Sequence, residues 1–156
     1  MFRRFDNAPL ELPTARSLAF RKLTSPVIQI LGKTITDGEF SGRTIVLRIG
    51  GKIGEASGIT IRVPPAWDYS SCLGAMSSDM LDTDTRRHSH LDDFMVGLIG
   101  AEITLFKSNP TNVILECSSI RIEKRSSNRE DSIQIEDHDH KKGYRIGQRS
   151  CVEESL

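Results

Sequence analysis

Histidine and carboxylate side chains, which are residue types that bind metals, alternate in two short segments of the sequence. Residues 137–140 read Asp-His-Asp-His, and residues 88–90 read His-Ser-His. A metal site needs ligands that further hydrogen bonds hold in place, and a polar tail does not supply them. We therefore expect neither a metal nor any other cofactor.

Glycines, serines and histidines occur, but not in the spacings that form catalytic motifs. Residues 50–55 read Gly-Gly-Lys-Ile-Gly-Glu, which matches neither the dinucleotide-binding nor the P-loop spacing. Neither GxSxG nor HExxH is present. No pattern brings a nucleophile, a base and an orienting group together. These features predict that the protein is not an enzyme.

The three cysteines, Cys72, Cys117 and Cys151, are widely spaced and form no CxxC motif. This spacing supports neither a zinc ribbon nor a thioredoxin-type motif, and it is typical of a reducing compartment. Cys117 lies in an apolar run, which indicates a small core residue.

Charge is balanced over the whole chain but not along it. The sequence has 21 Lys+Arg and 21 Asp+Glu residues among 156, which argues against nucleic-acid binding by bulk charge alone. Residues 1–25 hold five basic and two acidic side chains, a net charge of +3. No apolar run approaches the roughly 18 residues of a membrane helix, so we expect no membrane partner.

Apolar runs and alternating apolar residues predict five strands, the last with a bend near Ser118. Their ranges are 27–35, 43–49, 58–63, 102–106 and 113–122. Ile45, Leu47 and Ile49 share one strand face. The strands at 43–49 and 58–63 are expected to pair as a hairpin. Residues 36–42 are expected to form a turn, and residues 64–88 a long irregular link.

One short helix is predicted to begin at Ser89, which can cap it, and to end at Gly100. Its apolar stripe follows the spacing i, i+3, i+4 and i+7. The residues of this stripe are Leu91, Phe94, Met95 and Leu98.

The two ends of the chain are predicted to lack a core of their own. We expect a basic, partly disordered leader over 1–25, one domain over 26–123 and a disordered tail over 124–156. Within the tail, Ile133 and Ile135 alternate with polar residues and could add a strand to a partner's sheet. The surrounding acidic residues favour solvated disorder instead.

The order of three strands, a link with a helix and two strands resembles the OB-fold. The resemblance extends over residues 26–123. It includes the Leu-Gly-Lys at 31–33, the glycines at 50–51, the helix exit and strand at 98–105, and the closing strand at 117–122. The most similar group is the single-strand DNA-binding type, such as replication protein A, telomere CST and RMI-like small subunits. The resemblance implies an all-β fold with one short helix, closed as a five-stranded barrel.

In that family, aromatic rings stack on bases and cations contact phosphates on the face of strands two and three and its flanking loops. The resemblance assigns this nucleic-acid-binding role to Lys33, Phe40, Arg43, Arg48, Arg62, Trp67, Tyr69 and Lys107. The alternative is that Arg48 and Arg62 are solvated surface charges, that Phe40 plugs an end of the barrel, and that Trp67 and Tyr69 pin the long link to the domain.

The resemblance also implies a small subunit of a nuclear complex that handles single-stranded DNA in replication, repair or telomere capping. Its partners would be single-stranded DNA and a larger OB-fold subunit, which the stripe of Leu91, Phe94, Met95 and Leu98 would contact. Two alternatives remain open. In the first, the helix serves only as a plug at the end of the barrel. In the second, the protein is an adaptor that binds proteins without contacting nucleic acid.

Overall fold

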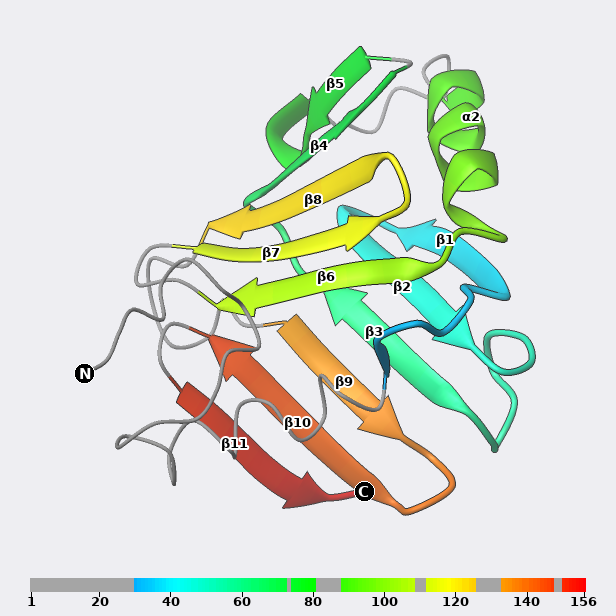
Figure 1. Ribbon diagram of the computed structural model, residues 1–156, viewed down its shortest axis with the longest axis vertical. Coiled ribbons are helices and arrows are strands. Elements are labelled where there is room, and N and C mark those ends of the chain that lie inside the picture. Colours follow the sequence, from blue (N-terminus) through cyan, green and yellow to red (C-terminus); the bar gives the residue numbers. More distant parts are fainter. Residues whose placement is uncertain (1–29, 73, 81–87, 109–111, 126–132, 148–149) are drawn as a thin grey trace.

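A computed structural model describes residues 30–72, 74–80, 88–108, 112–125, 133–147 and 150–156 of the chain. Within these residues the chain forms strands, one α-helix and one 3-10 turn (Figure 1). In chain order the elements are β1 (Asp37–Ser41), β2 (Thr44–Ile49), β3 (Ile59–Val63), β4 (Trp67–Ser71), β5 (Gly74–Ser77), η2 (Ser78–Met80), α2 (His88–Leu98), β6 (Ile103–Ser108), β7 (Asn112–Cys117), β8 (Ile120–Arg125), β9 (Ile133–Asp137), β10 (Lys142–Gly147) and β11 (Ser150–Ser155).

The first sheet has the strand order β1-β2-β3-β9-β10-β11, and each neighbouring pair is antiparallel. The predicted hairpin is confirmed, because Ile45 pairs with Val63 and Leu47 with Ile61. Directly opposite residues share a face of an antiparallel sheet. The isoleucine and leucine side chains of β2 and β3 therefore line one apolar face.

The second sheet has the strand order β5-β4-β8-β7-β6, also antiparallel. The predicted bend near Ser118 is a complete reversal, because Ser118 adopts a positive φ of 56° and Cys117 pairs with Ile120. The single strand expected over 113–122 is therefore two strands, β7 and β8.

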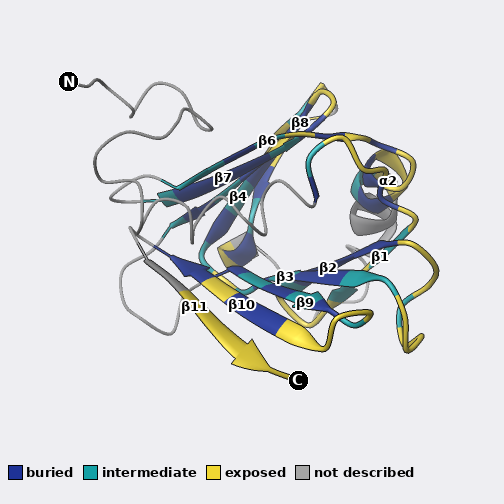
Figure 2. Cartoon of the chain, turned by 60° about the horizontal axis from the view of Figure 1, so that its bottom comes forward, coloured by how far each residue is buried: buried dark blue, intermediate teal, exposed yellow. Residues whose placement is uncertain are grey.

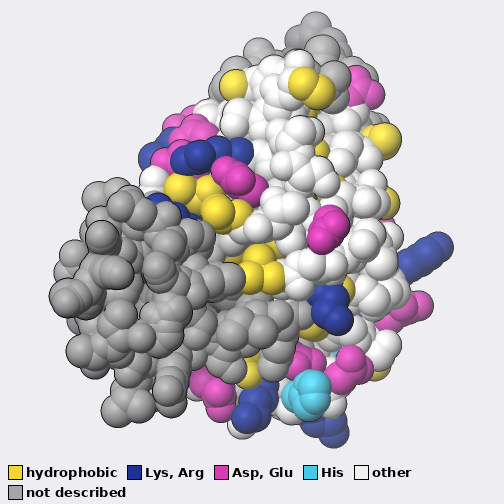
Figure 3. All heavy atoms as spheres, in the orientation of Figure 1, with side chains coloured by type: hydrophobic (Ala, Val, Ile, Leu, Met, Phe, Trp, Pro, Cys, Tyr) yellow, Lys and Arg dark blue, Asp and Glu magenta, His cyan; other side chains and the backbone are white. Residues whose placement is uncertain are grey.

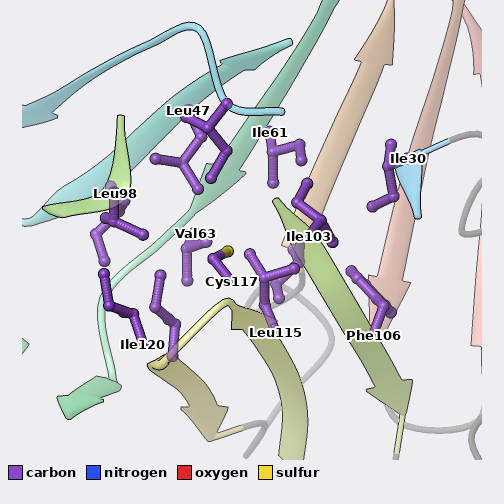
Figure 4. Packing of buried hydrophobic residues seen from close by; sticks show 14 of the residues in the cluster. Ile30, Leu47, Ile61, Val63, Leu98, Ile103, Phe106, Leu115, Cys117 and Ile120 are labelled. Atoms are coloured by element: carbon purple, nitrogen blue, oxygen red, sulfur yellow. The ribbon is translucent and has the colours of Figure 1, made fainter. Parts of the chain in front are cut away.

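The apolar faces of the two sheets enclose one core. The cartoon shows the sheets as two layers with α2 beside one end (Figure 2). Leu47 and Val63 from the first sheet point toward Leu115 and Cys117 from the second (Figure 4). Such burial stabilises a fold by about 25 cal/mol for each Å² of apolar surface removed from water.

The expected all-β fold with one short helix is confirmed, but the five-stranded barrel is not what the described strands form. They make two open antiparallel sheets of six and five strands, without a closed barrel. Part of the difference lies in the link expected over 64–88. It contributes β4 and β5, because Trp67, Tyr69 and Met76 alternate into the core.

The prediction of a disordered tail over 124–156 is wrong for residues 133–147 and 150–156. Strand β9 pairs with β3, and β10 and β11 extend the same sheet. Ile133, Ile135 and Ile146 are buried in the core. A few alternating apolar residues suffice here because β3 offers a ready partner strand. The predicted domain boundary at 123 is therefore also wrong.

The first described residues also differ from the predicted secondary structure. The leader expected over 1–25 lies outside the described residues. Residues 30–35, expected to be strand, form a helical turn and a single bridge between Thr34 and Glu102. Ile30 and Ile35 still enter the core. The turn expected over 36–42 is mostly β1.

Candidate functional site

Arg48 was expected on an exposed nucleic-acid face, but it is buried. Only 1% of the residue is accessible to solvent. Its guanidinium donates from Nη1 to the Thr60 hydroxyl at 3.1 Å and from Nη2 to the Glu55 carbonyl at 3.1 Å. Glu55 belongs to the loop over residues 50–58, and this loop covers the Arg48 side chain. Arg48 therefore cannot meet a phosphate at the surface, and this assignment is wrong.

Trp67 and Tyr69 were expected to stack on bases, and both are core residues instead. Both rings are buried between the two sheets. The Trp67 Nε1–H donates to the Arg43 carbonyl at 2.7 Å, and the Tyr69 hydroxyl donates to the Phe94 carbonyl at 2.8 Å. Burial raises the pKa of the Tyr69 hydroxyl well above its usual value. These two rings are therefore not accessible for stacking on bases.

The other residues assigned to nucleic acid are scattered. Lys33 and Arg43 are exposed. Lys33 precedes β1 and lies beside the start of β6, and Arg43 lies at the turn between β1 and β2. Lys107 is half-buried on the outer face of the five-stranded sheet. It pairs with Ile114, whereas the neighbouring pair of Phe106 and Leu115 faces the core. Arg62 lies on the outer face of the six-stranded sheet and forms an ion pair with Glu136. Phe40 packs against the core, with its ring centroid 6.0 Å from that of Trp67. These side chains therefore do not form one groove.

Charges of opposite sign lie side by side on the face shown in Figure 3, where lysines and arginines are interspersed with acidic side chains. On the outer face of the five-stranded sheet, Arg121 lies between Glu116 at 3.5 Å and Glu123 at 3.7 Å. Arg125 forms an ion pair with Asp68. Paired cations of this kind do not provide the continuous positive track that phosphates follow.

A polar network that the sequence did not reveal lies on the outer face of β2, β3 and β9. The Thr60 hydroxyl accepts from Arg48 and lies 2.9 Å from His138 Nε2. That nitrogen lies 3.9 Å from Glu136, the ion-pair partner of Arg62. The network was missed because His138 and Glu136 were assigned to a disordered tail. Alternation of Ile133 and Ile135 was the one signal for a strand there.

The glycine-rich loop over residues 50–58 is bound by carboxylates of its own chain. Asp37 accepts the Ile53 amide hydrogen at 3.0 Å, and Glu55 accepts the Lys52 amide hydrogen at 2.8 Å. The hydrogen bond from Ile53 is the main reason that the pKa of Asp37 lies below its usual value. These amides are therefore already satisfied and are not available as a phosphate cradle.

The expected partner stripe on α2 faces inward where the structure describes it. Leu98 and Met95 are buried, and Phe94 contacts the Tyr69 ring with centroids 4.5 Å apart. The side chain of Leu91 lies outside the described residues. The helix therefore acts as a plug at one end of the two sheets, and the partner-binding role of these side chains is not supported. Among the described side chains of this region, Val96 and Ile99 are the exposed large apolar ones.

Metal-ligating side chains are not gathered in the described part of the chain. Its His, Cys, Asp and Glu residues form no group of three that could hold a metal. His140 Nδ1 and Asp137 Oδ2 lie 2.6 Å apart and form a local pair in the turn between β9 and β10. Cys117 is buried, and desolvation raises the pKa of its thiol to about 12. No helix among the described residues is long and apolar enough to cross a membrane.

No family model, no curated protein and no solved structure matches the chain. Its function must therefore be inferred from its own residues.

Proposed function

We propose that the protein is a non-catalytic subunit that binds other proteins and does not contact nucleic acid. The observation that carries this proposal is the position of the aromatic rings. In the described part of the chain all six rings are buried or packed against the core: Phe40, Trp67, Tyr69, Phe94, Phe106 and Tyr144. Single-strand binding without sequence preference relies on exposed rings that stack on bases.

Surface chemistry supports the same proposal. The buried guanidinium of Arg48 and the paired Arg62 leave the central strands without a row of accessible cations. Open sheet edges and isolated apolar side chains such as Val96 remain accessible, and proteins bind to such features. The proposed role corresponds to the adaptor alternative of the OB-fold resemblance, with a larger OB-fold subunit as the candidate partner in the nucleus.

Affinity purification of the tagged full chain from its native cells, with and without nuclease, tests the proposal. We expect a stoichiometric protein partner that nuclease treatment does not release. Fluorescence anisotropy with labelled mixed-sequence single-stranded DNA should detect no micromolar binding at low salt. Salt-sensitive DNA binding by the purified chain, or a partner lost on nuclease treatment, would overturn the proposal.

A further inference from the structure

Strand β11 is the most open sheet edge in the described part of the chain. It pairs with β10 from Lys142–Ser155 to Gly147–Ser150 in an uninterrupted register. No described strand pairs with its other edge. It contains neither a bulge nor a proline, two devices that normally protect an edge from pairing.

The other three edges are shorter or covered. Residues 32–35 lie along the start of β6, where Gly32 donates to the Ile103 carbonyl at 2.8 Å and Ile103 donates to the Lys33 carbonyl at 2.9 Å. Helix α2 lies beside β1. Strand β5 has four residues, compared with six in β11. An added strand would therefore find its longest free template at β11.

The backbone of β11 points alternate hydrogen-bonding groups away from the protein. Leu156 donates its amide hydrogen to the Lys141 carbonyl at 3.0 Å. In an antiparallel ladder, successive residues point their amides in opposite directions. The amide and carbonyl groups of Glu153 and Ser155 therefore point away from β10 and can pair with an incoming strand.

Side chains beside this edge define the chemistry of the strand that would fit. Val152 and Leu156 are 56% and 51% exposed. Glu154 lies between them on the same face, because alternate residues of a strand share a face. Accordingly, Glu154 and Leu156 both lie close to Gly143. Glu153 points to the opposite face. An added strand thus meets two apolar side chains and two adjacent carboxylates.

Both carboxylates already have a cation one strand further in. Glu153 lies 3.5 Å from Lys142, and Glu154 lies 3.2 Å from Arg145. A carboxylate has about four lone-pair sites and can accept a hydrogen bond from a second cation. The carboxylates lie on the edge strand itself, so they are closer to an added strand than Lys142 and Arg145 are. Opposite charges placed directly across a strand pair stabilise it.

A second copy of this chain fits the edge poorly. In the two antiparallel two-fold registers centred on residues 153 and 154, a glutamate lies opposite its own copy. Like charges in that position destabilise the pair. A segment with basic residues at these positions avoids the repulsion.

From these observations we propose that β11 binds an extended segment of a partner protein with two consecutive basic residues. One aliphatic residue directly follows this basic pair, and a second precedes it with one residue between. The segment adds a seventh strand to the six-stranded sheet, antiparallel to β11. Backbone pairing with Glu153 and Ser155 supplies affinity. The carboxylates and the apolar pair of Val152 and Leu156 supply specificity. This inference rests on the proposed protein-binding function and names its site and the chemistry of its partner.

A labelled synthetic peptide with the core Val-Thr-Lys-Lys-Val-Thr is the probe, and the full chain is the receptor. In antiparallel pairing its valines lie opposite Leu156 and Val152, and its lysines opposite the two glutamates. We expect saturable binding by fluorescence anisotropy that weakens as salt rises. A control peptide with glutamates in place of the lysines should bind at least about fivefold more weakly, because like charges then face each other.

Two variants at position 153 separate the contribution of the backbone amide to peptide binding from that of the carboxylate. Glu153→Pro removes an outward amide hydrogen that β10 does not use, and proline is tolerated at such an edge position. Glu153→Thr removes the same carboxylate but keeps the amide. Relative to Glu153→Thr, Glu153→Pro should weaken peptide binding by a further factor of about ten. Thermal melts should show both variants folded, because neither interrupts the β10 ladder.

Charge reversal gives the opposite readout. Glu153→Lys combined with Glu154→Lys should make the chain prefer the glutamate peptide. Equal binding of the lysine peptide to Glu153→Pro and Glu153→Thr would overturn the proposal, as would no binding to the unaltered chain. A β11-dependent dimer that the peptide does not displace would also overturn it. If a nuclease-resistant partner still binds the Glu153→Pro chain, protein binding stands and the β11 site is wrong.

Discussion

Arg48 is a charged side chain that neutral oxygen atoms hold inside the fold. Its nearest hydrogen-bond partners are the Thr60 hydroxyl and the Glu55 carbonyl, and its Nε has no partner among the described residues. Burying a cation in this way is costly unless its hydrogen bonds are made. The Arg48 side chain therefore contributes to the stability of the fold by joining the 50–58 loop to β3.

Replacing Arg48 with methionine tests this role. Arg48→Met leaves the Thr60 hydroxyl and the Glu55 carbonyl without this donor and should lower the free energy of unfolding by about 1–3 kcal/mol. Arg62→Met is the matched control, because Arg62 is partly exposed, and its ion pair should contribute less than about 1 kcal/mol. Urea unfolding measures both. Equal losses for the two variants would show that Arg48 is not held as described.

The thiols of Cys117 and Cys72 should differ sharply in reactivity. Cys72 is exposed and Cys117 is buried, and the pKa of Cys117 is raised to about 12, so its reactive thiolate is scarce at neutral pH. In a Cys151→Ser background we expect one thiol to react with a thiol reagent in the native protein, and two in denaturant. Loss of native labelling in Cys72→Ser would assign the reactive group. Rapid labelling of Cys117 would contradict its burial.

At the scale of elements, Asp37 on β1 anchors the 50–58 loop through the Ile53 amide. Because this bond lowers the pKa of Asp37 in the folded state, it adds stability at neutral pH. That stability is lost as the pH falls through the lowered pKa. Asp37→Asn should therefore be less stable than the unaltered chain near neutral pH.

We expect this difference to shrink as the pH falls below the ordinary range of an aspartate pKa, because the carboxyl of the unaltered chain then becomes protonated. Urea unfolding across the pH range measures the gap. A gap of constant size would mean that the charge of Asp37 does not contribute to holding the loop.

Helix α2 contributes through its inward face. Leu98 is buried between the sheet ends, whereas Val96 is 71% exposed on the same helix. Leu98→Ala should cost about 2–5 kcal/mol of unfolding free energy, because it leaves a cavity. Val96→Ala should change it by less than about 0.5 kcal/mol. Chemical denaturation compares the two, and a larger effect at Val96 would contradict the plug.

At the scale of the whole molecule, the C-terminal strands are part of the core rather than an appendage. Ile135 on β9 is buried against β3, where it pairs with Ile61. Ile135→Ala should therefore cost about 2–5 kcal/mol. Val152→Ala on the exposed side of β11 should cost less than about 0.5 kcal/mol.

We expect Ile135→Ala and Val152→Ala each to unfold in one cooperative transition, because the two sheets share a single core. A chain ending at residue 125 should fail to fold cooperatively, since it loses Ile133, Ile135, Tyr144 and Ile146. An unchanged unfolding midpoint in Ile135→Ala would restore the interpretation of this region as a tail.

Local alternation sufficed to predict several elements. Ile45, Leu47 and Ile49 face one side of β2 as predicted, and β2 pairs with β3 as predicted. The helical stripe of Met95 and Leu98 faces the core, which was one of the two alternatives. These features follow from side-chain periodicity, which acts within a few residues and needs no knowledge of the rest of the chain.

Tertiary structure alone decided what covers each strand and which residues reach the surface. Arg48 and Arg62 have the same outward position in the pattern, yet only Arg48 lies beneath a loop. Trp67 and Tyr69 follow two prolines and read as link residues, yet they fill the space between the sheets. Likewise β9 is a strand because β3 has a free edge for it. Burial and pairing depend on distant parts of the chain, and the sequence near a residue does not contain that information.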